Sequence, residues 1–182
     1  PELDKRQQRV LLRQTMMETG KTLIEVPVLW CREGREVLRL VREVSGLNVI
    51  EREREQKRGV IIAIPPLGCW EMLGLYLSNN FPVTSLYRPP RYASFDHVVK
   101  EGRQALGATL VPTDAGGIKQ LLNALKHGEM TCILPDQDPR ESGGFFAPFF
   151  GIQANTMTLL NRLANKSDAI VLVGFAERLP RG

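Results

Sequence analysis

The sequence has few of the residues and patterns that mark several common protein classes. Its 182 residues include three cysteines and two histidines, and the cysteines lack the spacing of a metal site. An odd cysteine count without a signal peptide indicates a reducing compartment. No apolar run approaches the roughly 20 residues of a transmembrane helix. There is no internal repeat and no low-complexity linker. We therefore expect a globular domain without a metal site.

The composition is typical of a soluble globular protein. Apolar residues make up 43% of the chain and charged residues 24%, which is ordinary for folded domains. A chain of this length suits one domain with a sizeable core, so we expect residues 1–182 to form a single domain. Because the chain starts at Pro1 and ends at Gly182 just after an expected strand, we expect it to belong to a longer protein.

The net charge is +4 and is unevenly distributed. Basic residues outnumber acidic ones over residues 1–58, whereas acidic residues outnumber basic ones over residues 101–150. Net positive charge near one end favours an anionic lipid surface or an acidic partner. We expect no nucleic-acid partner.

Residues 1–58 predict an N-terminal, largely helical part. Apolar residues over 3–19 are spaced as on one face of a helix, and Gly20 is expected to end that helix. The next apolar stretch, 23–31, is broken by Pro27, which favours a second short helix or a membrane-facing elbow. A strand over 37–41 and a polar helix over 46–56 are also expected.

From Gly59 onward the pattern changes to alternating strands and helices. The β-branched run over residues 60–64 is typical of a buried parallel strand. Strands that alternate with helices predict an α/β fold over residues 59–182, with a mainly parallel sheet flanked by helices. The other expected strands cover 83–87, 109–111, 131–134 and 169–175. The expected helices cover 69–77, 95–106, 117–125 and 156–164.

Four short blocks in this part are candidate site segments, because active groups of α/β sheets lie beyond the carboxyl ends of strands. The four blocks are Pro66-Leu67-Gly68-Cys69-Trp70-Glu71, Tyr87-Arg88-Pro89, Asp136-Gln137-Asp138-Pro139 and Ala147-Pro148-Phe149-Phe150-Gly151. Their order and spacing resemble the bacterial lipid A biosynthesis acyltransferases (the lauroyl/myristoyl transferases).

The resemblance covers roughly Gly59 to Gly182 and implies a glycerol-3-phosphate-acyltransferase-like core. It also implies transfer of a fatty acyl group from an acyl carrier protein thioester to a hydroxyl of a lipid A precursor. The protein would act at the cytoplasmic face of the cell inner membrane, in contact with the membrane surface, and any anchor would lie outside this chain. No cofactor is expected.

The first block departs from the family at one position. The family has His-x-Gly-Asn/Cys-Trp-Glu, and Pro66 stands where the family has its catalytic histidine. In the intact motif the glutamate would orient the imidazole, which would take the proton of the attacking hydroxyl. Proline has no titratable group, so Glu71 is the catalytic candidate that this block retains.

The missing histidine leaves other hypotheses open. Glu71 could be a carboxylate that stabilises a helix N-terminus. The chain could be a non-catalytic homologue that binds acyl chains or acyl carrier protein. A third hypothesis is another member of the wider glycerolipid acyltransferase superfamily, although the third and fourth blocks match the lipid A branch better.

Two arginines and the third block supply candidate substrate-binding residues. Arg88 follows an expected strand and Arg103 lies one helix later, and the family has arginines at matching places. A guanidinium binds phosphate through two parallel hydrogen bonds. Asp136, Gln137 and Asp138 also follow a strand. These carboxylates could pair with either arginine, hold a turn or bind a metal; we favour pairing, since no second ligand cluster is visible.

Phenylalanines dominate the last block and its approach, with four between Gly143 and Gly151. Such a stretch would aggregate or bind an apolar partner if exposed. We therefore expect these side chains to fold over the core, with Phe149 and its neighbours forming a wall of the acyl-chain site. The two histidines, His97 and His127, are expected at the surface.

Overall fold

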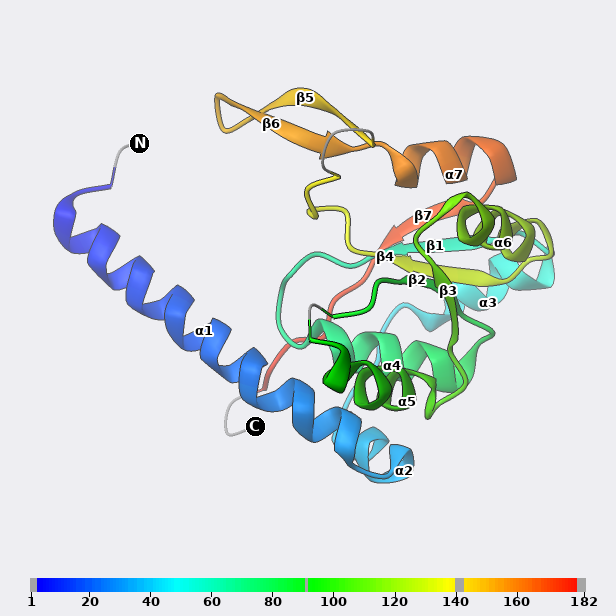
Figure 1. Cartoon of the computed structure of the whole chain (residues 1–182), viewed down its shortest axis with the longest axis horizontal. Helices are drawn as coiled ribbons and strands as arrows, with labels where there is room; N and C mark the ends of the chain where they lie inside the picture. The colour runs from blue at the N-terminus through cyan, green and yellow to red at the C-terminus, as the bar shows by residue number, and fades with distance from the viewer. Residues whose placement is uncertain (1–2, 91, 140–142, 180–182) are drawn as a thin grey trace.

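The computed structural model describes residues 3–90, 92–139 and 143–179, and it has the predicted α/β architecture. A parallel sheet lies between two layers of helices (Figure 1). The elements in chain order are α1 (Lys5–Cys31), α2 (Gly34–Leu38), α3 (Leu47–Glu55), β1 (Val60–Ala63), α4 (Trp70–Asn80), β2 (Thr84–Tyr87), α5 (Asp96–Gln104), β3 (Thr109–Pro112), α6 (Ala115–Lys126), β4 (Met130–Ile133), β5 (Gly144–Phe149), β6 (Ile152–Met157), α7 (Leu159–Ser167) and β7 (Ile170–Val173).

The sheet is built from parallel strands, as the sequence predicts. One group has the order β4-β1-β7, and β2 pairs with β3 in a second group. A single parallel bridge between Val83 and Met130 joins the two groups. The strand order is therefore β3-β2-β4-β1-β7 across the molecule, and the carboxyl ends of these strands lie at one edge.

The interior strand β1, which lies between β4 and β7, is buried on both faces, which explains its uninterrupted apolar sequence. Val60 and Ile62 pack with Leu77 of α4 and with α3 on one face of the sheet. Ile61 packs with Leu121 of α6 and with α7 on the other face. Figure 1 shows these two helical layers on opposite sides of the sheet.

The N-terminal segment forms one long helix, so the prediction that Gly20 ends it is wrong. Helix α1 begins at a capping box in which Asp4 and Gln7 exchange side-chain to backbone hydrogen bonds. It continues through Gly20 and Pro27, although proline removes one hydrogen bond of the helix. Burial of Leu29 against α2 and α4 holds the far end in place, and this tertiary packing overrides the local helix breakers.

Two other expectations also need correction. Residues 34–38 form the helix α2, where we expected a strand over 37–41; the helix buries Val37 completely. The helix expected over 156–164 begins at Leu159, because the preceding residues pair with β5 in an antiparallel hairpin. Among the described residues, no helix is both long enough and apolar enough to cross a membrane.

Candidate active site

The loop after β1 carries the first sequence block and leaves the sheet at its carboxyl edge. The Leu67 amide donates to the carbonyl of Pro65 at 2.7 Å, which makes Pro66 the central residue of a three-residue turn. The fixed φ of proline suits such a turn. Pro66 is exposed to solvent. Position 66 is therefore accessible at the strand ends, but its side chain has no acid–base chemistry.

Gly68 anchors this loop to the segment that follows β7. It has a φ of +61°, and a Cβ atom at this position would lie 1.8 Å from the carbonyl oxygen of Ala176. The amide of Cys69 donates to the same oxygen at 2.8 Å. Only glycine satisfies both the backbone angle and the close approach, which explains the glycine of the block.

Glu71 lies in the first turn of α4, and its exposed fraction is only 4%. Both carboxylate oxygens are occupied. Arg103 donates from Nε to Oε1 at 2.7 Å and from Nη2 to Oε2 at 3.1 Å. The indole Nε1 of Trp30 donates to Oε1 at 2.7 Å. A buried carboxylate is tolerated when a charge and well-formed hydrogen bonds compensate it, and this arrangement meets that condition.

Aromatic rings surround the Arg103 guanidinium. Its Cζ lies 5.7 Å from the ring centroid of Trp30, 5.6 Å from that of Trp70 and 5.9 Å from that of Tyr87. A guanidinium over aromatic faces gains cation–π energy, which is larger where water is excluded. The rings therefore hold Arg103 against Glu71 and surround the ion pair.

The Tyr87 hydroxyl extends this network toward α5. It donates to Asp96 Oδ1 at 2.9 Å, and Lys100 pairs with the other oxygen of Asp96 at 2.7 Å. Burial, with a smaller effect of the hydrogen bond to Asp96, raises the pKa of Tyr87 to about 12. The hydrogen bond from Lys100, followed by the one from Tyr87, lowers the pKa of Asp96. Tyr87 is thus a neutral donor at physiological pH.

The remaining candidates lie beyond neighbouring strand ends. Ala63 and Ile133 are paired at the ends of β1 and β4, so Pro66 and Asp136 each stand three residues past adjacent strands. Arg88 follows β2 at the same edge.

Arg103 pairs with Glu71 rather than with the aspartates of the third block. Asp138 accepts a hydrogen bond from Asn155 at 2.9 Å. Within the described ranges, the exposed side chains of Arg88 and Asp136 have no hydrogen bond or ion pair, so they do not form the pairing that we favoured from the sequence.

Comparison with known proteins identifies the family. The model of the bacterial lipid A biosynthesis acyltransferases matches residues 1–182. The chain belongs to this family. It is 31% identical over 134 residues to a lipid A biosynthesis acyltransferase of Haemophilus influenzae, which covers 73% of the chain and 42% of that relative.

Two relatives from Escherichia coli match more of the chain. The lipid A biosynthesis lauroyltransferase is 27% identical over 183 residues, which covers 100% of this chain and 59% of the relative. The lipid A biosynthesis palmitoleoyltransferase is 25% identical over 168 residues, which covers 90% of this chain and 54% of the relative. The chain therefore spans about half the length of the curated relatives that it matches.

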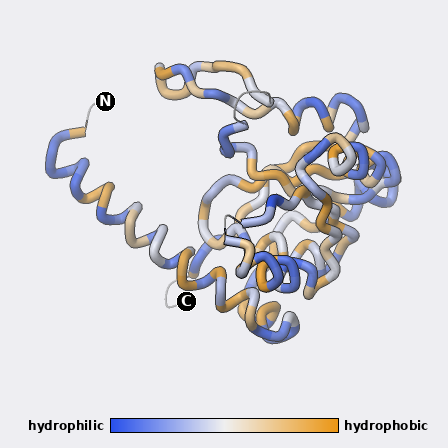
Figure 2. Tube along the Cα trace, in the orientation of Figure 1, coloured by the Kyte–Doolittle hydropathy of each residue, from blue (hydrophilic) through white to orange (hydrophobic). Residues whose placement is uncertain are grey.

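The phenylalanine block of this lipid A acyltransferase family member is not folded over the core as expected. It forms the hairpin β5–β6, in which Phe146 is 70% exposed, Phe149 65% and Phe150 92%. The hairpin projects away from the sheet, and hydrophobic residues extend to its tip (Figures 1 and 2). The prediction that these side chains are buried is therefore wrong; their role toward an acyl chain stays a prediction.

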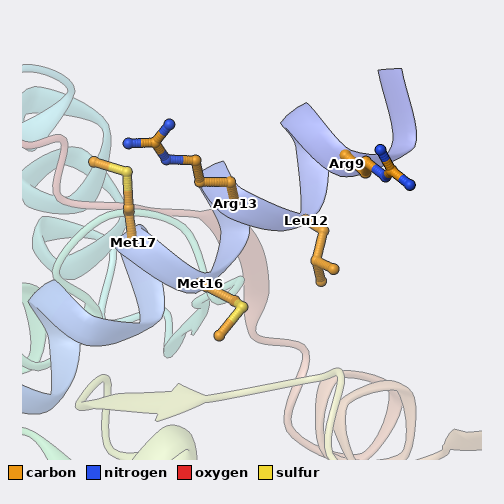
Figure 3. Close-up of a pocket in the computed structure, with 5 residues that line it drawn as sticks. All are labelled: Arg9, Leu12, Arg13, Met16 and Met17. Carbon is orange, nitrogen blue, oxygen red and sulfur yellow. The ribbon is translucent and has the colours of Figure 1, made fainter. Parts of the chain in front are cut away.

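A hollow adjoins the loop after β1. Leu67, Gly68 and Phe175 line it from the strand ends, and Lys21 and Arg178 belong to its polar rim. The hairpin phenylalanines do not line this hollow. A second, shallow hollow lies on α1 alone, where Figure 3 shows Arg9, Leu12, Arg13, Met16 and Met17.

The two histidines lie at the surface, as predicted. The ring of His97 is exposed and lies 3.1 Å from Glu101, its neighbour one turn along α5. The ring of His127 is hydrogen-bonded to the carbonyl of Asn123 at 2.7 Å. Each interaction is local to the histidine's own helix or its end.

Sequence reasoning missed three residues of the site: Trp30, Tyr87 as a donor, and Asp96. Trp30 is separated from Glu71 by 41 positions and belongs to a different helix. No local pattern links the two residues. The only signal in the sequence was that tryptophan is an amphipathic side chain, whose N–H needs a partner when it is buried.

Proposed function

We propose that the protein transfers a fatty acyl group from an acyl carrier protein thioester to a hydroxyl of a lipid A precursor. The observation that carries this proposal is the ion pair between Arg103 and the buried Glu71 of the first block, at the carboxyl edge of a parallel sheet in a chain of the lipid A acyltransferase family. The relatives are named for acyl transfer in lipid A biosynthesis, and the proposal extends that chemistry to this chain.

In the reaction, the acceptor hydroxyl oxygen would attack the thioester carbonyl carbon. A C–O bond forms, the C–S bond breaks, and the thiol of the carrier protein leaves with a proton. A base must take the proton of the hydroxyl. By the family resemblance this base would be the residue at position 66, but Pro66 has no group that can accept a proton. Glu71 and Arg103 would then be the part of the site that remains to orient polar groups at the strand ends.

Arg88 is the candidate for acceptor recognition. It is exposed at the carboxyl edge of the sheet, and the described part of the chain gives its guanidinium no acidic partner. An unpaired guanidinium can take a phosphate through two parallel hydrogen bonds. We infer that Arg88 binds the phosphate of the lipid A precursor. The residues after the neighbouring strand would help to orient this acceptor; they are Asp136, Gln137 and Asp138.

The membrane surface is the proposed setting for the reaction. Apolar side chains of α1 are exposed beside basic ones; Leu12 is 61% exposed and Met16 67%, next to Arg9 and Arg13. The N-terminal half of α1 and the phenylalanine hairpin both project from the side where the strands end (Figure 1). An apolar face flanked by cations suits an interface with anionic lipids. We place this surface at the cytoplasmic face of the inner membrane, with Phe149 near the acyl chain.

A second candidate function is binding without transfer, and Pro66 is the observation that favours it. Both histidines lie at the surface, where His97 pairs with Glu101 and His127 is hydrogen-bonded to the carbonyl of Asn123. A homologue without a base could still hold an acyl chain or acyl carrier protein through the same surfaces. Its signature would be donor binding in the natural protein and no acyl transfer even when a histidine is restored.

The test is acyl transfer by the full-length protein carrying Pro66→His, with an acyl carrier protein thioester and a lipid A precursor. In that background Glu71→Gln should lower kcat by about 10²-fold or more, because it removes the partner of the restored base. Arg88→Gln should raise KM for the acceptor with little change in kcat. The matched control is Arg162→Gln, an exposed arginine on α7.

If Arg88→Gln and Arg162→Gln behave alike, Arg88 does not bind the acceptor. If the restored protein binds the thioester but transfers nothing, binding without transfer is the function.

A further inference from the structure

Trp30 contributes a hydrogen-bond donor to the candidate site from outside the α/β core. It lies near the end of α1, and its indole N–H reaches Oε1 of Glu71 at 2.7 Å. The Nε of Arg103 donates to the same oxygen at 2.7 Å. Oε1 therefore accepts two strong hydrogen bonds, whereas Oε2 accepts one, from Nη2 of Arg103 at 3.1 Å. A carboxylate accepts about four hydrogen bonds, so Oε2 keeps capacity for one more donor.

The position of Trp30 depends on the absence of a side chain on α5. A Cβ atom at Gly102 would lie 2.5 Å from Trp30 Cβ and 2.6 Å from its Cγ. Gly102 is buried and directly precedes Arg103. The close approach of α1 and α5 thus places the indole against both members of the ion pair, since the Trp30 ring also lies 5.7 Å from the Arg103 guanidinium.

We propose that Trp30 is a positioning residue for the Glu71–Arg103 pair. Its N–H fixes one carboxylate oxygen, so that the carboxylate plane is set and Oε2 is presented to Arg103 and to one further polar group. The Gly102 contact makes this arrangement possible. The inference deepens the proposed function and rests on it for one point only, that the pair serves acyl transfer.

The hydrogen bond has a spectroscopic signature that does not depend on activity. The chain has two tryptophans, and Trp30→Phe in full-length ¹⁵N-labelled protein assigns the indole N–H signal of Trp30. A charged acceptor moves such a signal downfield. Glu71→Gln should therefore move the Trp30 signal upfield. Replacing Trp30 by benzothienylalanine, which keeps the ring shape but has no N–H, should move the side-chain Nε–H signal of Arg103.

Kinetics test the positioning role in the Pro66→His background. Both Trp30→Phe and the benzothienylalanine variant should lower kcat about tenfold, equivalent to about 1.4 kcal/mol, with KM for donor and acceptor unchanged. The isostere preserves packing, so a merely structural role would leave its kcat at the parent value. Gly102→Ala should reproduce the loss, because the added methyl group displaces the indole.

The outcomes separate this inference from the proposed function. An isostere with parent kcat, or a Trp30 signal unmoved by Glu71→Gln, overturns the positioning role while transfer itself stands. If no acyl transfer is detected in any version, the proposed function fails. The isostere then tests the positioning role: a shift of the Arg103 Nε–H signal supports it, and an unchanged signal overturns it.

Discussion

Removing the charge of Arg103 tests the energetic role of the ion pair most sharply. In Arg103→Met the aliphatic bulk remains, and the buried carboxylate of Glu71 keeps a single donor, Trp30. Breaking a fully buried pair from one side costs about 3–5 kcal/mol. The Arg103 side chain is 28% exposed, so water and salt can partly replace it, and we expect a cost below this range, about 2–3 kcal/mol.

The assay is thermal and urea unfolding of the full-length protein at neutral pH. For a chain of this size, 1 kcal/mol shifts the midpoint by about 2–4 °C, so Arg103→Met should lower it by roughly 5–10 °C. The double variant Glu71→Gln/Arg103→Met should recover most of the loss, since no charge is then left unpaired. Surface substitutions usually change stability by no more than about 0.5 kcal/mol. A single variant within that margin of the parent, or a double variant as unstable as the single one, would show that Arg103 does not compensate the buried charge of Glu71.

Three further predictions follow from the loop, the cysteines and the hairpin. Gly68→Ala should destabilise the protein by roughly 2 kcal/mol or more from strain and steric clash. Gly20→Ala, with open space around it in α1, should stabilise the protein by about 0.5–1 kcal/mol. Similar unfolding curves for the two variants would contradict the loop geometry at Gly68. Burial raises the pKa of the Cys132 thiol to about 12. Iodoacetamide at pH 8 should therefore label the exposed Cys31 and leave Cys132 unmodified, as measured by mass spectrometry. Equal labelling of the two cysteines would show that the Cys132 thiol is accessible to solvent. Phe150→Ser should weaken binding to vesicles containing anionic lipid in a sedimentation assay, and unchanged binding would remove the hairpin from the membrane contact.

The sequence predicted the parts of the fold that depend on local pattern. The β-branched run of β1 is buried on both faces, and burial in a parallel sheet is what this run predicts. The path of α1 could not be predicted, because Gly20 and Pro27 locally favour a break. Contacts distant in sequence stabilise the continuous helix, among them the ion pair of Arg178 with Glu25 at 2.6 Å.

The place of the candidate site at the strand ends could be predicted for the same reason. The block around Glu71 follows a strand, and strand ends are where polar groups of α/β sheets gather. Which arginine meets Glu71 was not predictable, since Arg103 lies 32 positions away on a different helix.

The hairpin also escaped prediction. In a strand, successive side chains point to opposite faces, and adjacent phenylalanines therefore occupy both faces of β5. Among the described residues, no element covers either face enough to bury Phe145, which is 55% exposed, or Phe146, which is 70% exposed.

The most direct test of the central claim compares the natural full-length protein with its Pro66→His variant. Both are assayed for acyl transfer from an acyl carrier protein thioester to a lipid A precursor. Position 66 is exposed at the centre of a turn that histidine can also adopt. We expect the variant to transfer acyl groups about 10²–10⁴-fold faster than the natural protein, since a positioned general base supplies that factor. Equal, robust transfer by both would contradict it and show that position 66 is not where the base belongs.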